Sequence, residues 1–92
     1  MGQSLHTKIA LSVWQGRIAP VFDVSREILV FELSEGHVAS SVMHALTGEE
    51  PDIRKHLASR LGIETLICGA ISDYLSRAIE ASGVRVIPIV AG

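Results

Sequence analysis

The sequence predicts an α/β domain built on a mixed five-stranded sheet, and three observations support this class. Five short segments are rich in apolar, mostly β-branched residues. Two stretches with apolar residues at helical spacing separate the last three segments. Glycine, proline and serine punctuate the junctions. With 92 residues, of which 48% are hydrophobic, the chain has the size and composition of one globular domain, so we expect a single domain over residues 1–92.

The first half of the chain predicts three strands. Residues 8–13 form a short apolar run, and residues 14–20 interrupt it with loop-forming glycine and proline. Residues 28–33 are rich in β-branched and aromatic side chains, as strands usually are. The turn signal at 34–36, with glycine last, joins this strand to the next, at 37–43. These two strands should therefore form a hairpin.

The first predicted helix follows this hairpin. Residues 47–50 have the spacing of a capping box, and Pro51 suits a first helical turn. Apolar residues then recur at helical spacing, and three basic residues between them are expected to face water: Ile53, Leu57 and Leu61, with Arg54, Lys55 and Arg60. Gly62 should end this helix.

The last third of the chain predicts a strand, a helix and a strand. Residues 65–68 form the uninterrupted apolar run of a central parallel strand. Ser72 has the chemistry of an N-cap, and Gly83 should close the helix that Ser72 starts. Residues 84–90 form the last strand, and Pro88 indicates that it is an edge strand or ends there.

The resulting order, β-β-β-α-β-α-β, predicts the strand order 3-2-1-4-5. Both crossovers should be right-handed and move the same way across the sheet, which places both helices on one face. The other face would then be uncovered, although an apolar sheet face does not stay bare in water. We expect a second copy of the chain, a missing C-terminal helix or a partner protein to cover it.

The composition and motifs argue against several kinds of partner and binding site. The net charge is −2 and the basic residues do not cluster, so nucleic acid is not expected as a partner. The single cysteine excludes an internal disulfide, and the sequence has neither a signal-peptide pattern nor an apolar run long enough to span a bilayer. We therefore expect a cytoplasmic protein with no membrane contact. The sequence lacks CxxC, HxxxH, GxGxxG and P-loop motifs, which argues against a closed zinc site and against nucleotide binding by those routes.

Ligands of α/β sheets bind at the carboxyl ends of parallel strands, near a change in strand order. The predicted topology brings four segments to that edge: 14–23, 44–48, 68–72 and 90–92. Among the histidines, only His44 falls there.

Within the turn after the fourth predicted strand, Cys68 is followed by Gly69 and Ala70, and Ser72 starts a helix. Such a turn offers backbone N–H groups to an anion and favours a thiolate, which is a soft metal ligand. The alternative is that Cys68 is a small core residue.

Four other residues at this edge have two interpretations each. His44 is either a metal ligand or an ordinary surface histidine. Trp14 forms either a stacking wall for a bound cluster or a plug over the core. Arg17 is either an anion clamp or a solvated charge. Asp23 is expected to shape its loop through an Asx-turn.

Three segments, at 16–23, 66–72 and 83–88, resemble in order and spacing the dinitrogenase iron-molybdenum cofactor family, which includes NifX, NafY and the C-terminal domain of NifB. The resemblance implies a ribonuclease-H-like α/β fold. It also implies a non-enzymatic binding or carrier role for an iron-molybdenum cofactor, its precursor or a related Mo/Fe–sulfur cluster. On this hypothesis Cys68 and His44 ligate metal, and Trp14, Arg17, Gly69, Ala70 and Ser72 line the site. Many members carry histidine where this chain has Val21.

Two rival functions remain. One is a metal-free, homodimeric interaction or regulatory module that works through the uncovered sheet face. The other is a cysteine-dependent enzyme that uses Cys68. Nuclease chemistry of the ribonuclease H type is excluded, because it needs carboxylates on the first strand and residues 8–13 contain none.

Overall fold

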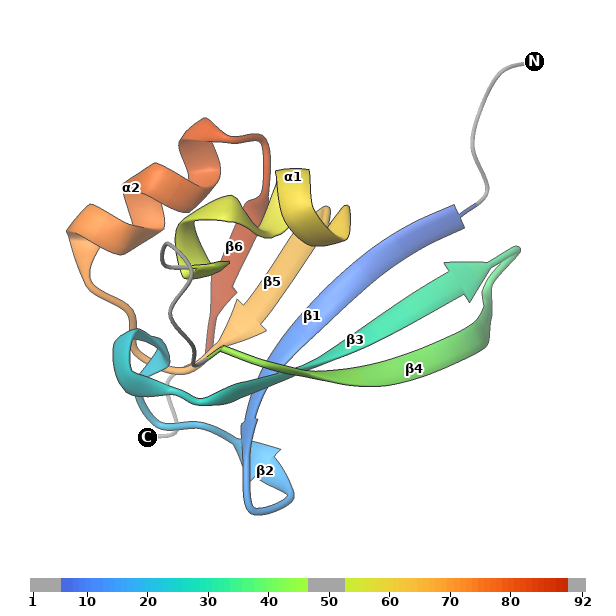
Figure 1. Cartoon of the computed structure of the whole chain (residues 1–92), viewed down its shortest axis with the longest axis horizontal. Helices are drawn as coiled ribbons and strands as arrows, with labels where there is room; N and C mark the ends of the chain where they lie inside the picture. Colours follow the sequence, from blue (N-terminus) through green and yellow to red (C-terminus); the bar gives the residue numbers. More distant parts are fainter. Residues whose placement is uncertain (1–5, 47–52, 90–92) are drawn as a thin grey trace.

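The computed structural model describes residues 6–46 and 53–89 (Figure 1). The elements follow one another as β1 (His6–Trp14), β2 (Arg17–Ile18), the 3-10 helix η1 (Phe22–Val24), β3 (Glu27–Ser34), β4 (His37–Ala45), the 3-10 helix η2 (Ile53–His56), α1 (Leu57–Leu61), β5 (Thr65–Cys68), α2 (Asp73–Ala81) and β6 (Arg85–Pro88).

The five main strands form one sheet in the order β4-β3-β1-β5-β6. β3 lies antiparallel to both β1 and β4, whereas β5 is parallel to both β1 and β6. The α/β class, the predicted strand order and the predicted strand directions are therefore confirmed. β6 is an edge strand that ends at Pro88, as the proline indicated.

A sixth, two-residue strand lies inside the segment that the sequence predicted as a loop. β2 pairs with the end of β1, with Val13 opposite Ile18 and Trp14 opposite Arg17. The turn between them places Gln15 at φ 51° and Gly16 at φ 78°. Two consecutive residues with positive φ form a tight hairpin turn whose twist matches that of the flanking strands. This hairpin holds Trp14 and Arg17 side by side.

The first helical segment is shorter and more irregular than predicted. A 3-10 turn, η2, leads into the five residues of α1. Gly62 ends α1 at φ 71°, as predicted, and its N–H donates to the carbonyl of Ala58 at 3.0 Å. The expected capping box and Pro51 lie outside the described residues.

The second helix begins and ends where the sequence indicated. The side chain of Ser72 caps α2 by accepting a hydrogen bond from the backbone N–H of Leu75 at 3.3 Å. Leu75 and Ile79 are buried on the inner side of the helix.

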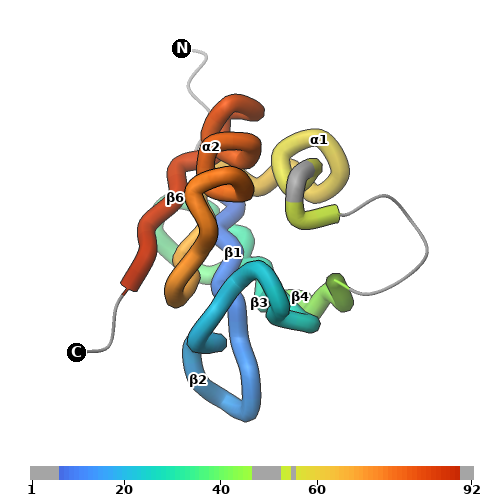
Figure 2. The backbone as a smooth tube through the Cα atoms, turned by 90° about the vertical axis from the view of Figure 1, so that its left-hand side faces the viewer, coloured from blue at the N-terminus to red at the C-terminus, as the bar shows by residue number. Residues whose placement is uncertain are grey.

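The core lies between the helices and one face of the sheet. Figure 2 shows α1 and α2 on the same side of the strands. The side chains that fill this layer come from alternate strand positions, from both helices and from η1: Ala10, Ile28, Val30, Leu66 and Cys68, with Leu57, Leu75, Ile79 and Phe22. Each large apolar side chain buried in this way contributes about 1.5–3 kcal/mol. The placement of both helices on one face is therefore as predicted.

None of the described helices is long and apolar enough to cross a bilayer.

Candidate functional site

The loop between β2 and β3 is joined to the turn between β5 and α2. Val21 forms a parallel bridge with Ala70. The N–H of Phe22 donates to the carbonyl of Ala70, and the N–H of Ala70 donates to the carbonyl of Pro20, each at 2.8 Å. The Phe22 side chain is fully buried beneath the loop. Two segments far apart in sequence are thus fixed together at the carboxyl edge of the sheet.

Gly69 allows this close approach. A Cβ atom at this position would lie 2.5 Å from the carbonyl oxygen of Pro20 and would also clash with the carbonyl oxygen of Ala19. Both obstacles are backbone atoms, which cannot rotate away as a flexible side chain would. Gly69 therefore serves the packing of two backbone segments.

Asp23 occupies the N-terminus of α2. Its Oδ1 accepts the Ser72 N–H at 2.9 Å, and its Oδ2 accepts the Ser72 hydroxyl at 2.6 Å. Desolvation raises the pKa of Asp23, but the Ser72 hydrogen bonds outweigh it and hold the pKa below its usual 3.8. A carboxylate at a helix N-terminus is also favoured by the helix dipole.

The backbone N–H groups that were predicted to bind an anion at the Cys68–Ser72 turn therefore already donate to acceptors within the chain. Asp23 takes the N–H of Ser72, and Pro20 takes the N–H of Ala70. Gly69, Ala70 and Ser72 hold the loop in place in this structure, and Asp23 ties the loop to α2 instead of forming a purely local turn.

Arg54 clamps the same loop from the helical side. Its half-buried guanidinium donates to the carbonyl oxygens of Phe22 at 3.3 Å, Leu46 at 3.4 Å and Ser25. The prediction that Arg54 faces water was wrong, because the side chain folds over the end of η1. A guanidinium has several donors in a fixed plane, so it can hold several carbonyls at once.

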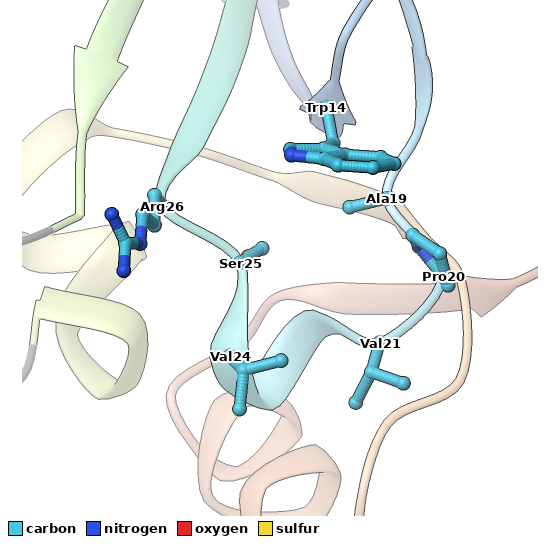
Figure 3. Close-up of a pocket in the computed structure, with 7 residues that line it drawn as sticks. All are labelled: Trp14, Ala19, Pro20, Val21, Val24, Ser25 and Arg26. Atoms are coloured by element: carbon cyan, nitrogen blue, oxygen red, sulfur yellow. The ribbon is translucent and has the colours of Figure 1, made fainter.

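Above this fixed loop lies a pocket of about 250 Å³ (Figure 3). Its lining comes from the end of β1 and from the loop that contains η1: Trp14, Ala19, Pro20, Val21, Val24, Ser25 and Arg26. The indole of Trp14 lies on one side of the pocket, and Val21 and Val24 lie on the other with their side chains directed away from the ring. All three are exposed, at 52%, 40% and 73%. Exposed large apolar side chains around a hollow are typical of a binding site.

The charged groups around this pocket are basic. Arg26 contributes to its rim, with its guanidinium directed outward (Figure 3). Arg17 is exposed and is the cross-strand partner of Trp14. Directly paired residues project to the same side of a sheet, so Arg17 lies on the side of the Trp14 ring. Asp23, the nearby acidic residue of this loop, is bonded to Ser72.

Cys68 is not accessible at this site. Its side chain is fully buried in the core. Desolvation, with a smaller effect from the charge of Asp23, raises the pKa of the thiol from 9.0 to about 11. A buried, protonated thiol does not offer the soft thiolate that the sequence suggested, so the core alternative describes this residue.

His44 lies apart from Cys68. It is opposite Ile28 on the helix side of β4, where it lines a separate groove of about 390 Å³ together with Lys8 and Arg60. β4 and β5 are three places apart in the sheet, so their backbones are about 14 Å apart. The expected pairing of Cys68 with His44 on one metal is therefore not formed. Within 6–46 and 53–89, no three His, Cys, Asp or Glu side chains gather to hold a metal ion.

Sequence reasoning missed Val24, Ser25 and Arg26 as lining residues. A signal was present, since Val21, Phe22 and Val24 make this loop more apolar than a solvated loop requires. Only one of the three, Phe22, enters the core. The exposure of the other two could not be read from sequence, because it depends on how η1 turns.

Solved structures with the same fold support this architecture. The crystal structure of PH0822 matches with a TM-score of 0.80 at 15% identity, covering 94% of this chain and 80% of that one. A protein from Methanocaldococcus jannaschii, mj0327, provisionally described as a dinitrogenase, matches its crystal structure with a TM-score of 0.68 at 16% identity. That match covers 95% of this chain and 77% of the other. No curated protein matches the sequence.

The sequence itself matches a family model described as dinitrogenase iron-molybdenum cofactor, over residues 6–92. The matched span includes all three segments that carried the resemblance, and it includes all seven residues that line the pocket beside Trp14. Members of this family are in general cofactor-binding or carrier proteins. The chain therefore belongs to the dinitrogenase iron-molybdenum cofactor family and, at that level, is connected with the biosynthesis or binding of the cofactor.

Proposed function

We propose that this protein binds an iron-molybdenum cofactor, its precursor or a related anionic metal–sulfur cluster as cargo, in the pocket beside Trp14, and passes it on unchanged. The observation that carries the proposal is the pocket itself. It is a preformed, largely apolar hollow at the carboxyl edge of the sheet, and part of its lining comes from residues 16–23, one of the segments that carry the resemblance to the family.

The chemistry of the lining suits such a cargo. Sulfide surfaces are soft and polarizable, and they pack favourably against an indole ring and aliphatic side chains. The negative charge of the cluster would be balanced by Arg17 and Arg26, which flank the hollow. Trp14 and Arg17 thus keep the roles that the sequence suggested, whereas Gly69, Ala70 and Ser72 act by holding the loop.

The lining also suits transfer. The seven lining residues that the structure describes include no thiol, imidazole or carboxylate. A cluster held by packing and charge would have no protein–metal bond to break on release, so a receiving protein with true ligands would take it readily. This feature favours a carrier over a permanent cofactor site. The cysteine-dependent enzyme receives no support, because Cys68 is buried with a raised pKa.

Anaerobic uptake tests the proposal. Purified protein is mixed with isolated iron-molybdenum cofactor and separated by gel filtration, and Mo and Fe are measured in the protein fraction. We expect about one cofactor per chain, and we expect Arg26→Gln to weaken binding roughly tenfold, which corresponds to about 1.4 kcal/mol.

Arg77→Gln provides the matched control. Arg77 is an exposed arginine on α2, outside the pocket, so this variant makes the same change in net charge. Equal losses in both variants would indicate non-specific attraction to positive charge. No uptake by the wild-type protein would refute the proposal.

A further inference from the structure

The sheet face opposite the helices is apolar across its full width. One row of cross-strand partners runs through all five main strands and consists entirely of large apolar residues: Met43, Leu29, Leu11, Ile67 and Ile87. The neighbouring row places Phe31 beside Ile9. Alternation along the strands puts these side chains opposite the core residues Ala10, Val30 and Leu66.

No element within the described residues covers this face. The side chains of α1 and α2 that are buried pack against the other face, and Figure 2 shows both helices on that side. At the two edges of the apolar row, Met43 is 50% exposed and Ile87 is 39% exposed. An apolar row that crosses all five main strands of a sheet face is a candidate interface, although Ser41, Thr65 and Arg85 lie in the neighbouring row.

From this face we infer that the protein forms a homodimer in which the uncovered sheets of two copies pack face to face. The area supports a second copy as the occupant. Five strands at about 4.8 Å spacing and about six residues of length give a face of about 24 Å by about 20 Å. Two such faces together cover about 960 Å², which is close to the roughly 1,000 Å² of buried surface that a specific interface needs.

The charges at the margin of the face suggest how the two copies are arranged. Glu27 and Arg85 are exposed and follow the same alternation as Leu29 and Ile87, so both project on this face. Glu27 lies on β3 at the carboxyl edge, opposite Val13, whereas Arg85 lies on the edge strand β6 at the other end, opposite Thr65. The two opposite charges therefore occupy nearly opposite corners.

A two-fold axis in the interface brings these corners together. The line from Glu27 to Arg85 passes within about half a strand spacing of the centre of the sheet, so an axis perpendicular to it places the two sheet faces over one another, with their apolar rows crossing near the centre. This axis places each Glu27 over the Arg85 of the other copy. The strands of the two sheets then cross at roughly 90°, which is one of the two common ways in which sheets pack.

The dimer leaves the pocket free. Trp14 has the same alternation as Ala10 and Ser12 and thus lies on the helix side of the sheet. Each dimer would carry two open pockets, and this inference does not depend on what the pockets bind.

Analytical ultracentrifugation over a range of concentrations tests the dimer with a pair of neighbouring substitutions. Met43 and Val42 are both 50% exposed and adjacent on β4, but they point to opposite faces. We expect a wild-type dimer, a monomer for Met43→Glu and an unchanged dimer for Val42→Glu. Circular dichroism shows whether each variant is folded, and Ile87→Lys repeats the test at the other edge of the sheet.

The charged corners allow a sharper test that does not disturb the apolar row. Glu27→Arg and Arg85→Glu should each weaken the dimer by at least tenfold in dissociation constant, because each places like charges together. Mixing the two variants should restore it, since each pairing is then opposite in sign. A wild-type monomer at all concentrations, a dimer insensitive to Met43→Glu, or single variants that mixing does not restore would overturn the inference.

Discussion

Cys68 lies at the end of a central strand with its thiol in the apolar core, and its ionisation is coupled to folding. The pKa is about 11 in the folded state against 9.0 for a free thiol, mainly because of desolvation. The contribution of the neutral thiol to stability is therefore fully present below pH 9.0 and is lost as the pH rises toward 11. We expect unfolding to become easier over this interval, and Cys68→Ala to reduce this pH dependence at a cost of roughly 1 kcal/mol at neutral pH.

Alkylation gives a second measurement of Cys68. Iodoacetamide should modify the native protein far more slowly than the denatured protein at pH 8, because the thiol is buried and protonated. Cys68→Ala should bind the isolated cofactor as tightly as the wild-type protein does. Rapid alkylation together with lost cofactor uptake would restore the metal-ligand role suggested by the sequence.

Asp23 makes the stability of the protein depend on pH in the acidic range, through the loop that lines the pocket. Its pKa is lowered because the charged form accepts two hydrogen bonds from Ser72. The stability that it contributes is present above pH 3.8 and is lost as the pH falls through the lower folded-state pKa. We expect Asp23→Ala to cost about 1 kcal/mol at pH 7 and to flatten the acid limb of the stability curve, measured by urea unfolding. An acid limb as steep in Asp23→Ala as in the wild-type protein would contradict this role of Asp23.

Val21 lines the pocket, and the resemblance to the family implies histidine at this position in many members. Val21→His would place an imidazole, a common ligand for transition metals, against the bound cluster. We expect roughly tenfold tighter binding of the isolated cofactor, or about 1.4 kcal/mol, and slower release to an acceptor. The half-time of transfer measures this directly. Unchanged affinity and release would mean that the cluster does not reach this side of the pocket.

At the scale of the element, η1 and its flanking loop depend on Arg54. The guanidinium joins the carbonyls of Phe22, Ser25 and Leu46 and so fixes the segment that presents Val24. Arg54→Lys keeps the charge but loses the planar set of donors, so the side chain can no longer hold all three carbonyls at once. We expect a loss of about 2 kcal/mol in stability, seen as a lower urea midpoint, together with weaker cofactor binding. Arg77→Lys is the matched control, and equal effects of the two changes would contradict the clamp.

The elements were largely predictable because their signals are local. An apolar run indicated β1, β-branched and aromatic residues indicated β3, and the turn signal at 34–36 indicated β4. Ser72 marked the start of α2, and Gly62 marked the end of α1. β2 was missed because two residues carry no periodicity, and only the positive φ of Gln15 and Gly16 reveals the turn. α1 came out shorter because its first turn is a 3-10 turn, a distinction that apolar spacing does not make.

The candidate site was less predictable, because it is set by contacts between distant segments. The sequence brought Trp14, Arg17 and the turn after β5 to the correct edge. It could not show that Asp23 fills the helix N-terminus, that Arg54 crosses to η1, or that Cys68 points inward. Each of these depends on the direction in which the side chain points, and contacts with distant parts of the chain set that direction.

At the scale of the whole molecule, two features stand on opposite sides of the sheet. The helix side holds the core and, at the carboxyl edge of the sheet, the pocket beside Trp14, and the other side holds the apolar row. The separation allows cluster binding and self-association to be tested independently. Met43→Glu should abolish the dimer and leave cofactor affinity nearly unchanged, whereas Arg26→Gln should do the reverse.

The most direct test of the proposed function measures the fluorescence of Trp14, which is the only tryptophan in the sequence and forms one wall of the pocket. Isolated iron-molybdenum cofactor is titrated anaerobically into the protein, with a free tryptophan derivative as the control for absorption of light by the cofactor. We predict saturable quenching that reaches its end point near one cofactor per chain and that needs roughly tenfold more cofactor in Arg26→Gln. Quenching no stronger than that of the free derivative would show that the cluster does not occupy this pocket.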